Sequence, residues 1–212
     1  MTTMLVIRHG QSISNLQHIF TGHLDLPLTE LGHAQAGVTA QYIKDNFHVD
    51  KIYASDLRRA YDTGDAVARL FGLTVQTDQR LREIFAGEWE GKTFDELTEQ
   101  YPNYTAFRSN IGLCATDGGE TVAQLSERAL EGFRDIAEQN DGSTIVIATH
   151  ATPIRALQCH CEGKSPAQMK DVPWVTNASV TVVEYDNGSF RLREVCHDSH
   201  LGGIVSRFPS NV

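Results

Sequence analysis

The chain has 212 residues, and its 27 Asp and Glu outnumber its 18 Lys and Arg, which gives a formal net charge of −9. This acidic balance argues against partners that need basic patches, namely nucleic acid and anionic membrane surfaces. The length suits one compact domain that buries a core without disulfides. No apolar run reaches the length of a membrane span and no signal peptide is recognisable, so we expect a cytoplasmic protein.

The first half of the chain predicts strands that alternate with helices. A short apolar run before Arg8 is typical of a buried strand, and a loop is expected over residues 10–28. Thr29 and Ser55 are suited to cap helices, because their hydroxyl groups can accept hydrogen bonds from the first turn. The expected order is strand 4–7, helix from 29 to about 46, strand 51–54, helix from 55 to about 71, and strand 73–77.

The second half continues the alternation. Two capping boxes, Thr93 with Glu96 and Thr121 with Gln124, predict a short helix and a long helix. The run 143–149 is the strongest strand, and the following Thr152-Pro153 is typical of an N-cap and first helical residue. Asp186-Asn187-Gly188 separates the runs 179–185 and 190–196, which indicates a β-hairpin.

This order predicts an α/β fold, a three-layer α/β/α sandwich whose mostly parallel sheet has its last strand as an antiparallel edge. We expect a single domain over residues 1–212, with a small cap segment at about 85–117.

Two predicted strands end in histidine. Arg8-His9-Gly10 follows the first strand and His150 follows the strongest one. Ligands of α/β proteins bind at the carboxyl ends of the strands, so both histidines would face one crevice if these strands are neighbours. Clustered arginine suits a phosphoryl group and repels a divalent metal. The pattern therefore favours phosphoryl chemistry, and we expect Cys159 and Cys161 to be buried thiols and not zinc ligands.

Several blocks of the sequence resemble the histidine phosphatases, the superfamily that includes cofactor-dependent phosphoglycerate mutase. The blocks occur in the family's order and cover nearly the whole chain. They are RHGQSISN at 8–15, GHLDLPLTELGHAQA at 22–36, SDLRRA at 55–60 with Thr63, LREI at 81–84, GEWEG at 87–91, GGET at 118–121, HATPIRAL at 150–157 and HL at 200–201.

The resemblance implies a phosphoglycerate mutase-like fold and a role for each matching residue. His9 would attack phosphorus, Glu83 would be the general acid and base, and the positive potential would come from Arg8, Arg59 and His150. Substrate or phosphate binding would fall to Asn15, Thr21, Gly22 and Ala151. Arg58 and Arg59 lie on different helix faces, and Arg59 is the one that matches the family position. The implied chemistry needs no metal and no cofactor.

The chain departs from the family pattern at Ala151, where the family usually has glycine. An alanine serves there only if the backbone does not need a positive φ. Among the remaining side chains near the motifs, we expect Trp89 to pack in the core, Phe85 to pack and not to line the substrate site, and Glu88 and Glu90 to be solvated. His23 is close enough to the phosphate loop to be a minor candidate for substrate contact.

We expect a phosphomonoester hydrolase that acts on a small phosphorylated metabolite as a monomer or homodimer. The alternative is a phosphoglycerate mutase, whose lid would carry adjacent arginines. Residues 92–119 hold only Lys92 and Arg108 as cations, which favours hydrolysis. A second alternative is a non-catalytic protein that binds phosphorylated metabolites in the same pocket.

Overall fold

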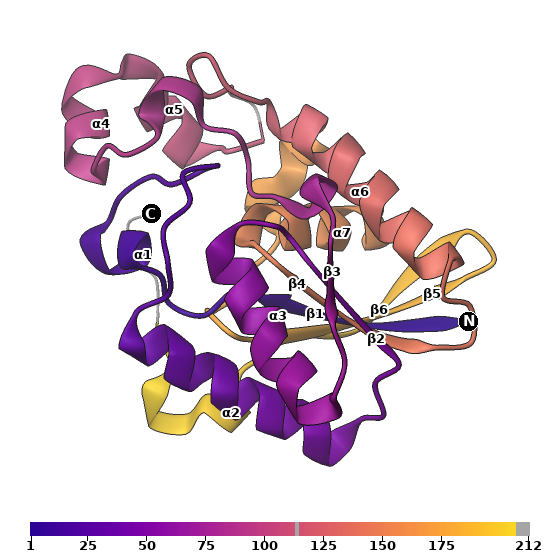
Figure 1. The fold of residues 1–212 in the computed structure, drawn as a ribbon. Helices are drawn as coiled ribbons and strands as arrows, with labels where there is room; N and C mark the ends of the chain where they lie inside the picture. The colour runs from indigo at the N-terminus through magenta and orange to yellow at the C-terminus, as the bar shows by residue number, and fades with distance from the viewer. Residues whose placement is uncertain (113–114, 207–212) are drawn as a thin grey trace.

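A six-stranded sheet runs through the computed structural model, which describes residues 1–112 and 115–206 (Figure 1). Its order is β3-β2-β4-β1-β5-β6. The strands are β1 Thr2–Arg8, β2 Lys51–Ala54, β3 Val75–Thr77, β4 Thr144–Thr149, β5 Val180–Asp186 and β6 Ser189–His197. The α-helices are α1 Ile13–Gln17, α2 Glu30–Asn46, α3 Arg58–Phe71, α4 Phe94–Gln100, α5 Pro102–Ser109, α6 Val122–Glu138 and α7 Ala151–Cys161. In the described ranges, every helix is too short or too polar to cross a membrane.

The sheet is parallel from β3 to β1 and antiparallel beyond it. β1 pairs in parallel with β4, whereas β5 is antiparallel to β1 and β6 is antiparallel to β5. Asn187 and Gly188 form the tight turn between β5 and β6 with φ of +47° and +82°, the conformation that Asn-Gly hairpins favour. The predicted mostly parallel sheet with an antiparallel last strand is confirmed. The strand before it, β5, is antiparallel as well.

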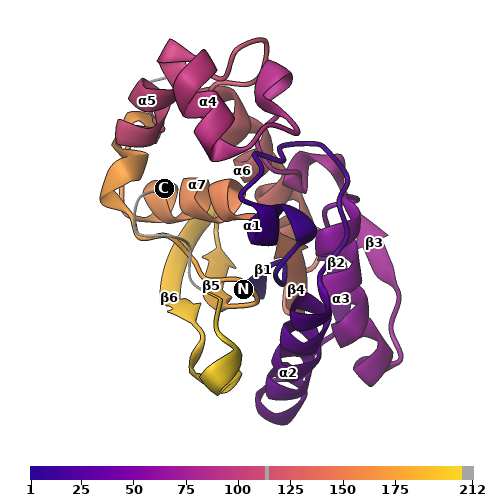
Figure 2. The ribbon, with the colours of Figure 1, turned by 90° about the vertical axis from the view of Figure 1, so that its left-hand side faces the viewer.

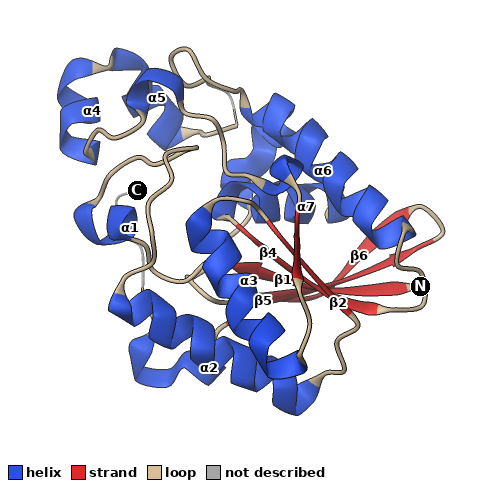
Figure 3. Cartoon of the chain, viewed as in Figure 1, coloured by secondary structure: helices blue, strands red, loops and turns tan. Residues whose placement is uncertain are grey.

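Helices cover both faces of the sheet, as Figures 2 and 3 show. Alternate residues of β1 point to opposite faces, because side chains along a strand have a period of two. Met4 and Val6 pack in a buried cluster with α6 and α7, whereas Leu5 and Ile7 pack with α2 and α3. The expected three-layer α/β/α arrangement is therefore present, and it explains why β1 is apolar on both faces.

A third cluster lies under α4 and α5, on the side of the molecule away from the N-terminus (Figure 1). Trp89 is completely buried there and packs edge-on against Tyr104 and Phe107. The packing role expected of Trp89 is confirmed. α5 was not predicted as a separate helix, because its eight residues, which begin at a proline, are too few for a clear helical period.

Several element boundaries differ from the prediction, among them those of α3, α7 and β3. α3 begins after Leu57 and not after Ser55, whose hydroxyl accepts from the backbone N–H of Leu57 at 3.3 Å and also contacts His150. α7 begins directly after β4, so its N-cap is His150, and Thr152 and Pro153 are already helical. β3 is shorter than expected.

The expected loop over residues 10–28 contains α1. Ser12 caps this helix and forms a capping box with Asn15. A five-residue helix leaves too little periodicity to be distinguished from a loop in the sequence.

Candidate active site

The carboxyl ends of β1 and β4 bring two histidines together. Arg8 lies opposite Thr149 in the parallel register, and the next residues, His9 and His150, leave the sheet side by side. Their ring centroids are 5.2 Å apart, with an interplanar angle of 62°. The prediction that these strands are neighbours and that their histidines share one crevice is confirmed.

The hydrogen bond of His9 fixes which of its nitrogens carries the proton. Nδ1 lies 2.7 Å from the carbonyl oxygen of Gly10. A carbonyl only accepts, so Nδ1 is the donor, and Nε2 carries the lone pair when the ring is neutral. Burial, then the charge of Arg59, then that of Arg8 holds the pKa of His9 well below 6.5. The ring is therefore neutral at physiological pH, with Nε2 available as a nucleophile.

His150 is also buried and neutral. Its Nε2 lies 2.9 Å from the hydroxyl of Ser55, at the end of β2. Its Nδ1 has no hydrogen-bond partner within the described chain. Burial and the neighbouring Arg59 hold the pKa of His150 well below 6.5. His150 can thus donate or accept a single further hydrogen bond next to His9.

Arg8 and Arg59 supply positive charge beside the histidines. Arg8 is 3% exposed and donates from Nη1 to the carbonyl of Val175, whereas Arg59 is 1% exposed. Burial lowers the pKa of each to about 10, so both remain cations at neutral pH. Arg58 lies on the solvent side of α3 with 63% of its side chain exposed. Only Arg59 points inward, as the adjacent positions on one helix require.

Glu83 lies on the loop after β3 and lines the same cavity as His9. Its Oε1 accepts from the backbone N–H of Ile84 at 2.8 Å, and Oε2 accepts from that of Thr152 in the first turn of α7 at 3.3 Å. His23 Nε2 lies 2.9 Å from the carbonyl oxygen of Glu83, so the His23 ring supports the loop that carries this carboxylate.

Arg128 of α6 holds the same loop from the other side. It donates to the carbonyls of Arg80, Arg82 and Glu83 at 2.8–2.9 Å and forms a two-pronged ion pair with Glu120. Glu120 in turn accepts from the N–H of Phe85. The loop around Glu83 is therefore fixed at several backbone positions, which orients the carboxylate without touching it.

A cavity of about 480 Å³ opens at this end of the sheet. The predicted site residues that line it are Arg8, His9, Asn15, Thr21, Gly22, Arg59, Glu83 and Ala151. His150 lies behind the lining, completely buried against His9. The structure thus brings all nine sequence-predicted residues to one place, while their chemical roles stay predictions.

The four residues expected to bind phosphate make different contacts. Asn15 Oδ1 accepts from Ser12, and Thr21 Oγ1 donates to the carbonyl of Ile19. Gly22 has φ of +51°, and its carbonyl accepts from Arg59 at 2.8 Å. Ala151 has no positive φ, so alanine at this position is not strained.

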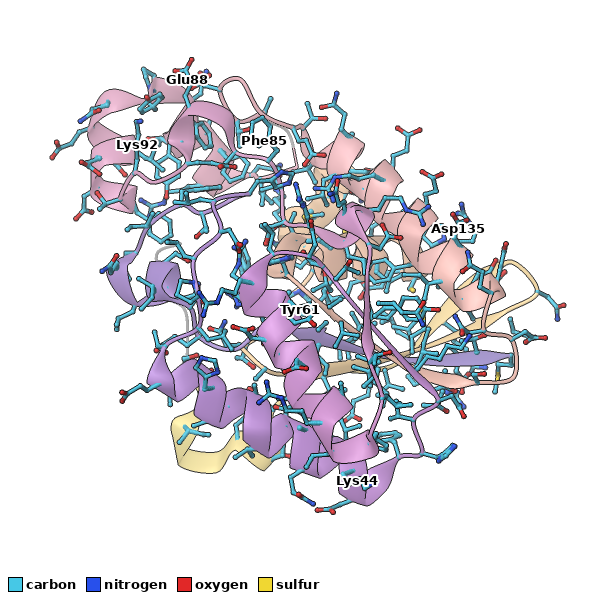
Figure 4. The ribbon with its side chains drawn as sticks, in the orientation of Figure 1. Lys44, Tyr61, Phe85, Glu88, Lys92 and Asp135 are labelled. Atoms are coloured by element: carbon cyan, nitrogen blue, oxygen red, sulfur yellow. The ribbon has the colours of Figure 1, made fainter. Side chains whose placement is uncertain are left out.

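The side chains around the cap segment differ partly from expectation. Phe85 packs against His23 with ring centroids 5.2 Å apart and does not line the cavity. Figure 4 shows Phe85, Glu88 and Lys92 on the side of the molecule that carries α4 and α5. Glu88 is exposed as expected. The expectation for Glu90 was wrong, because its Oε1 accepts from the backbone N–H groups of His23 and Ala86.

Three supporting residues were missed by sequence reasoning. Ser55 stands at the end of a parallel strand, so the rule that located the histidines could have found it. Asn177 donates to the carbonyl of His9 at 2.9 Å, and Arg128 fixes the Glu83 loop. These two come from segments far away in the sequence, and no local pattern marks them.

The described residues form no cluster of three or more His, Cys, Asp or Glu side chains that could hold a metal ion. Cys159 and Cys161 pack against different apolar clusters, on opposite sides of α7. Burial raises the pKa of both thiols. The interpretation of these cysteines as packed thiols therefore suits their surroundings.

The fold and the site define an α/β protein with two neutral histidines and two buried arginines at the carboxyl ends of parallel strands. Such a site is suited to bind and attack an anionic group. The sequence profile of the histidine phosphatase superfamily (branch 1) matches residues 4–198, and the chain belongs to this superfamily.

Several relatives align over almost the whole chain. Phosphoglycerate mutase-like protein 4 of Arabidopsis thaliana is 33% identical, over 97% of this chain and 90% of its own. Phosphoserine phosphatase 1 of Hydrogenobacter thermophilus is 29% identical, over 93% of this chain and 94% of its own.

The fold is shared with solved structures of the same family. YhfR of Bacillus stearothermophilus has a TM-score of 0.90 at 31% identity, over 95% of this chain and 100% of its own. The H9A mutant of a phosphoserine phosphatase of Entamoeba histolytica, solved with phosphoserine, has a TM-score of 0.83 at 31% identity. The match covers 95% of this chain and 100% of that one.

Proposed function

We propose that this protein is a phosphomonoester hydrolase that acts through a phosphohistidine at His9 on a small phosphorylated metabolite. The observation that carries the proposal is the state of His9. Its Nδ1–H is bound to Gly10, its ring is neutral, and its Nε2 adjoins a cavity with two buried guanidinium groups. The relatives named as phosphatases support the reaction class.

In the first step, the Nε2 lone pair of His9 attacks phosphorus. The N–P bond forms as the ester P–O bond breaks, and Glu83 gives its proton to the leaving oxygen. Arg8, Arg59 and His150 stabilise the charge on the phosphoryl oxygens. The hydrogen bond from Nδ1–H to Gly10 strengthens as the ring becomes cationic.

In the second step, Glu83 accepts a proton from water, and the water oxygen attacks phosphorus. The N–P bond breaks, inorganic phosphate leaves, and His9 returns to its neutral state with Glu83 protonated again. The two steps together consume one water and one ester and release one alcohol and one phosphate. All of the proton transfers are assigned to side chains of the cavity, and no step uses a metal or cofactor.

We assign the cap segment of about 85–117, which lies on one side of the cavity, a role in substrate choice. Residues 113–114 of this segment lie outside the described structure. We treat residues 1–212 as a single domain. Tyr104, Phe107 and Ile111 of the cap segment line the cavity. They give this wall an apolar surface, which suits the carbon part of a small substrate. A cytoplasmic location and a monomeric or homodimeric state stay predictions from the sequence.

The test compares two activities of one preparation: phosphate release from a panel of phosphomonoesters, and interconversion of 3- and 2-phosphoglycerate. We expect phosphate release from at least one small metabolite and slow or undetectable interconversion. Fast interconversion with negligible hydrolysis would favour the mutase alternative. Binding of phosphorylated metabolites with neither activity would favour the non-catalytic alternative.

A further inference from the structure

Arg155 of α7 presents a buried guanidinium group to the cavity that contains His9. The residue is 2% exposed. Nη2 donates to the carbonyls of Met169 and Val172, at 2.6 and 3.3 Å. Nε and Nη1 are buried and have no hydrogen-bond partner, and Arg155 forms no ion pair within the described parts of the chain. Three of the five N–H donors of this guanidinium group are therefore unused.

A buried charge without a counter-charge destabilises the folded state, so proteins pair such groups or use them to bind a ligand. Burial lowers the pKa of Arg155 to about 10, which leaves it cationic at neutral pH. The ring of Trp174 lies over the guanidinium group, 4.2 Å from Cζ to the ring centroid, and holds it against the cavity wall. The guanidinium group is buried, charged and incompletely hydrogen-bonded.

The charge of the cavity exceeds what a phosphate group requires. Three of its lining cations are buried, namely Arg8, Arg59 and Arg155, whereas Arg108 and Lys170 are exposed to solvent. A phosphomonoester carries a charge of about −1.5 to −2, which Arg8 and Arg59 balance. Glu83 is the one acidic residue of the described lining, and it acts as the proton donor of the first step. One buried positive charge remains, and it corresponds to one further negative charge on the substrate.

We propose that Arg155 forms a subsite for a carboxylate of the substrate, so that the preferred substrates are small phosphomonoesters that also carry a carboxylate. This assignment rests on the proposed function. Arg155 follows Ala151 by four residues on one helix, which separates their backbones by about 6 Å along the axis. The two anionic groups of the substrate are therefore a few bonds apart.

The position of Arg155 relative to Glu83 supports this arrangement. Glu83 Oε2 accepts from the backbone N–H of Thr152, and Arg155 follows Thr152 by three residues on α7, so the guanidinium group lies on the side of the cavity that carries the proposed proton donor. A carboxylate bonded to the carbon skeleton of the leaving alcohol reaches that side while phosphorus faces His9.

The experiment uses two pairs of substrates that differ in the carboxylate. O-phosphoserine is compared with O-phosphoethanolamine, and 3-phosphoglycerate with glycerol 3-phosphate. We expect kcat/KM of the wild-type protein to be about 10- to 100-fold higher for the carboxylate member of at least one pair, the size of a charge-assisted hydrogen bond. This comparison needs no variant, so it does not depend on the folding of one.

Variants then assign the preference to Arg155. Arg155→Met is expected to remove the preference by lowering kcat/KM for the carboxylate member and to change the other member by less than about 3-fold. Arg155→Lys retains the charge and is expected to recover part of the preference. Arg69→Met is the control, because this arginine is 80% exposed on α3 and should change neither member.

The outcomes separate this proposal from the proposed function. Phosphate release with equal kcat/KM for both members of each pair would overturn the carboxylate subsite and leave the phosphatase intact. An unchanged preference in Arg155→Met would also overturn it, as would a wild-type preference for fructose 1,6-bisphosphate over both carboxylate substrates. Absence of phosphate release from every substrate would instead contradict the proposed function.

Discussion

One hydrogen bond at His9 decides which ring nitrogen carries the lone pair. Because Nδ1 lies 2.7 Å from the Gly10 carbonyl, Nε2 is left as the nucleophilic atom of the neutral ring. Asn177 holds the His9 carbonyl at 2.9 Å, and so fixes the backbone from which the ring projects. The chemistry assigned to this residue thus depends on backbone contacts as much as on the nearby charges.

The role of Glu83 can be tested with substrates whose leaving groups differ in their need for a proton. Glu83→Gln removes the proposed proton donor but keeps the shape of the side chain, so we expect kcat for alkyl phosphates to fall about 10²- to 10⁴-fold. p-Nitrophenol leaves without a proton, so its burst from p-nitrophenyl phosphate should persist while steady-state turnover slows. Rapid-mixing absorbance measures both phases.

The control for this experiment is Glu88→Gln, five residues along the same segment and exposed to solvent. It should leave both phases unchanged. Unaltered turnover of alkyl phosphates in Glu83→Gln would remove Glu83 from the proton-transfer role.

At the scale of elements, the turn after β1 packs against the start of α2 through two glycines. A Cβ atom on Gly32 would collide with the carbonyl of Gln11, and one on Gly10 would collide with the backbone of Gly32. These are backbone contacts that a rotamer change cannot relieve. The close approach of α2 therefore fixes the turn whose Gly10 carbonyl orients His9.

Gly32→Ala is expected to lower the free energy of unfolding by about 1–3 kcal/mol and to reduce kcat, because the turn must shift. Gly37→Ala is the matched control on the same helix, since nothing lies within 4 Å of its added Cβ. That change should stabilise the protein by about 0.5–1 kcal/mol without affecting activity. Urea unfolding and steady-state kinetics measure both effects, and equal behaviour of the two variants would contradict the role of the glycine contact.

The sequence predicted elements best where the pattern was local. The capping boxes at Thr93 and Thr121 and the Asn187-Gly188 turn were located correctly, because each depends on neighbouring residues alone. The caps at Ser55 and Thr152 were wrong for a tertiary reason. The hydroxyl of Ser55 contacts His150 at the end of the neighbouring strand, and β4 passes into α7 without a connecting turn.

The same distinction holds for the site. His9 and His150 could be placed because strand ends gather at one edge of a parallel sheet. Arg128 and Asn177 could not be predicted, because each donates to a backbone carbonyl of a residue that is far away in the sequence.

Across the whole molecule, the charge is separated between surface and cavity. The chain has a net charge of −9, yet Arg8, Arg59 and Arg155 are buried around one cavity. The attraction for an anionic substrate is therefore local, and the overall field contributes little to its capture. We infer that the acidic surface does not oppose anion binding, because screened surface charges act weakly over the distance to the cavity.

The buried neutral histidines make global stability depend on pH. Both have a folded-state pKa well below 6.5, so below that pH the unfolded state binds more protons and stability falls as the pH is lowered. Between pH 7.5 and 5.5 each contributes a loss of about 1.4 kcal/mol. In urea unfolding, His150→Gln should reduce the pH-dependent loss by that amount.

His48→Gln serves as the comparison, because that side chain is 85% exposed. It should leave the pH-dependent loss as it is in the wild-type protein. Identical pH dependence in wild type and His150→Gln would show that His150 is not held neutral by the fold.

The most direct test of the account is a search for the covalent intermediate at His9. After rapid mixing with a substrate and quenching in base, peptide mass spectrometry of the wild-type protein should locate a phosphoryl group on His9, and acid should remove it. His9→Ala should show no such adduct and no turnover, while it still binds inorganic phosphate. Phosphate release by His9→Ala at the wild-type rate, or a phosphoryl group on another residue, would contradict the account.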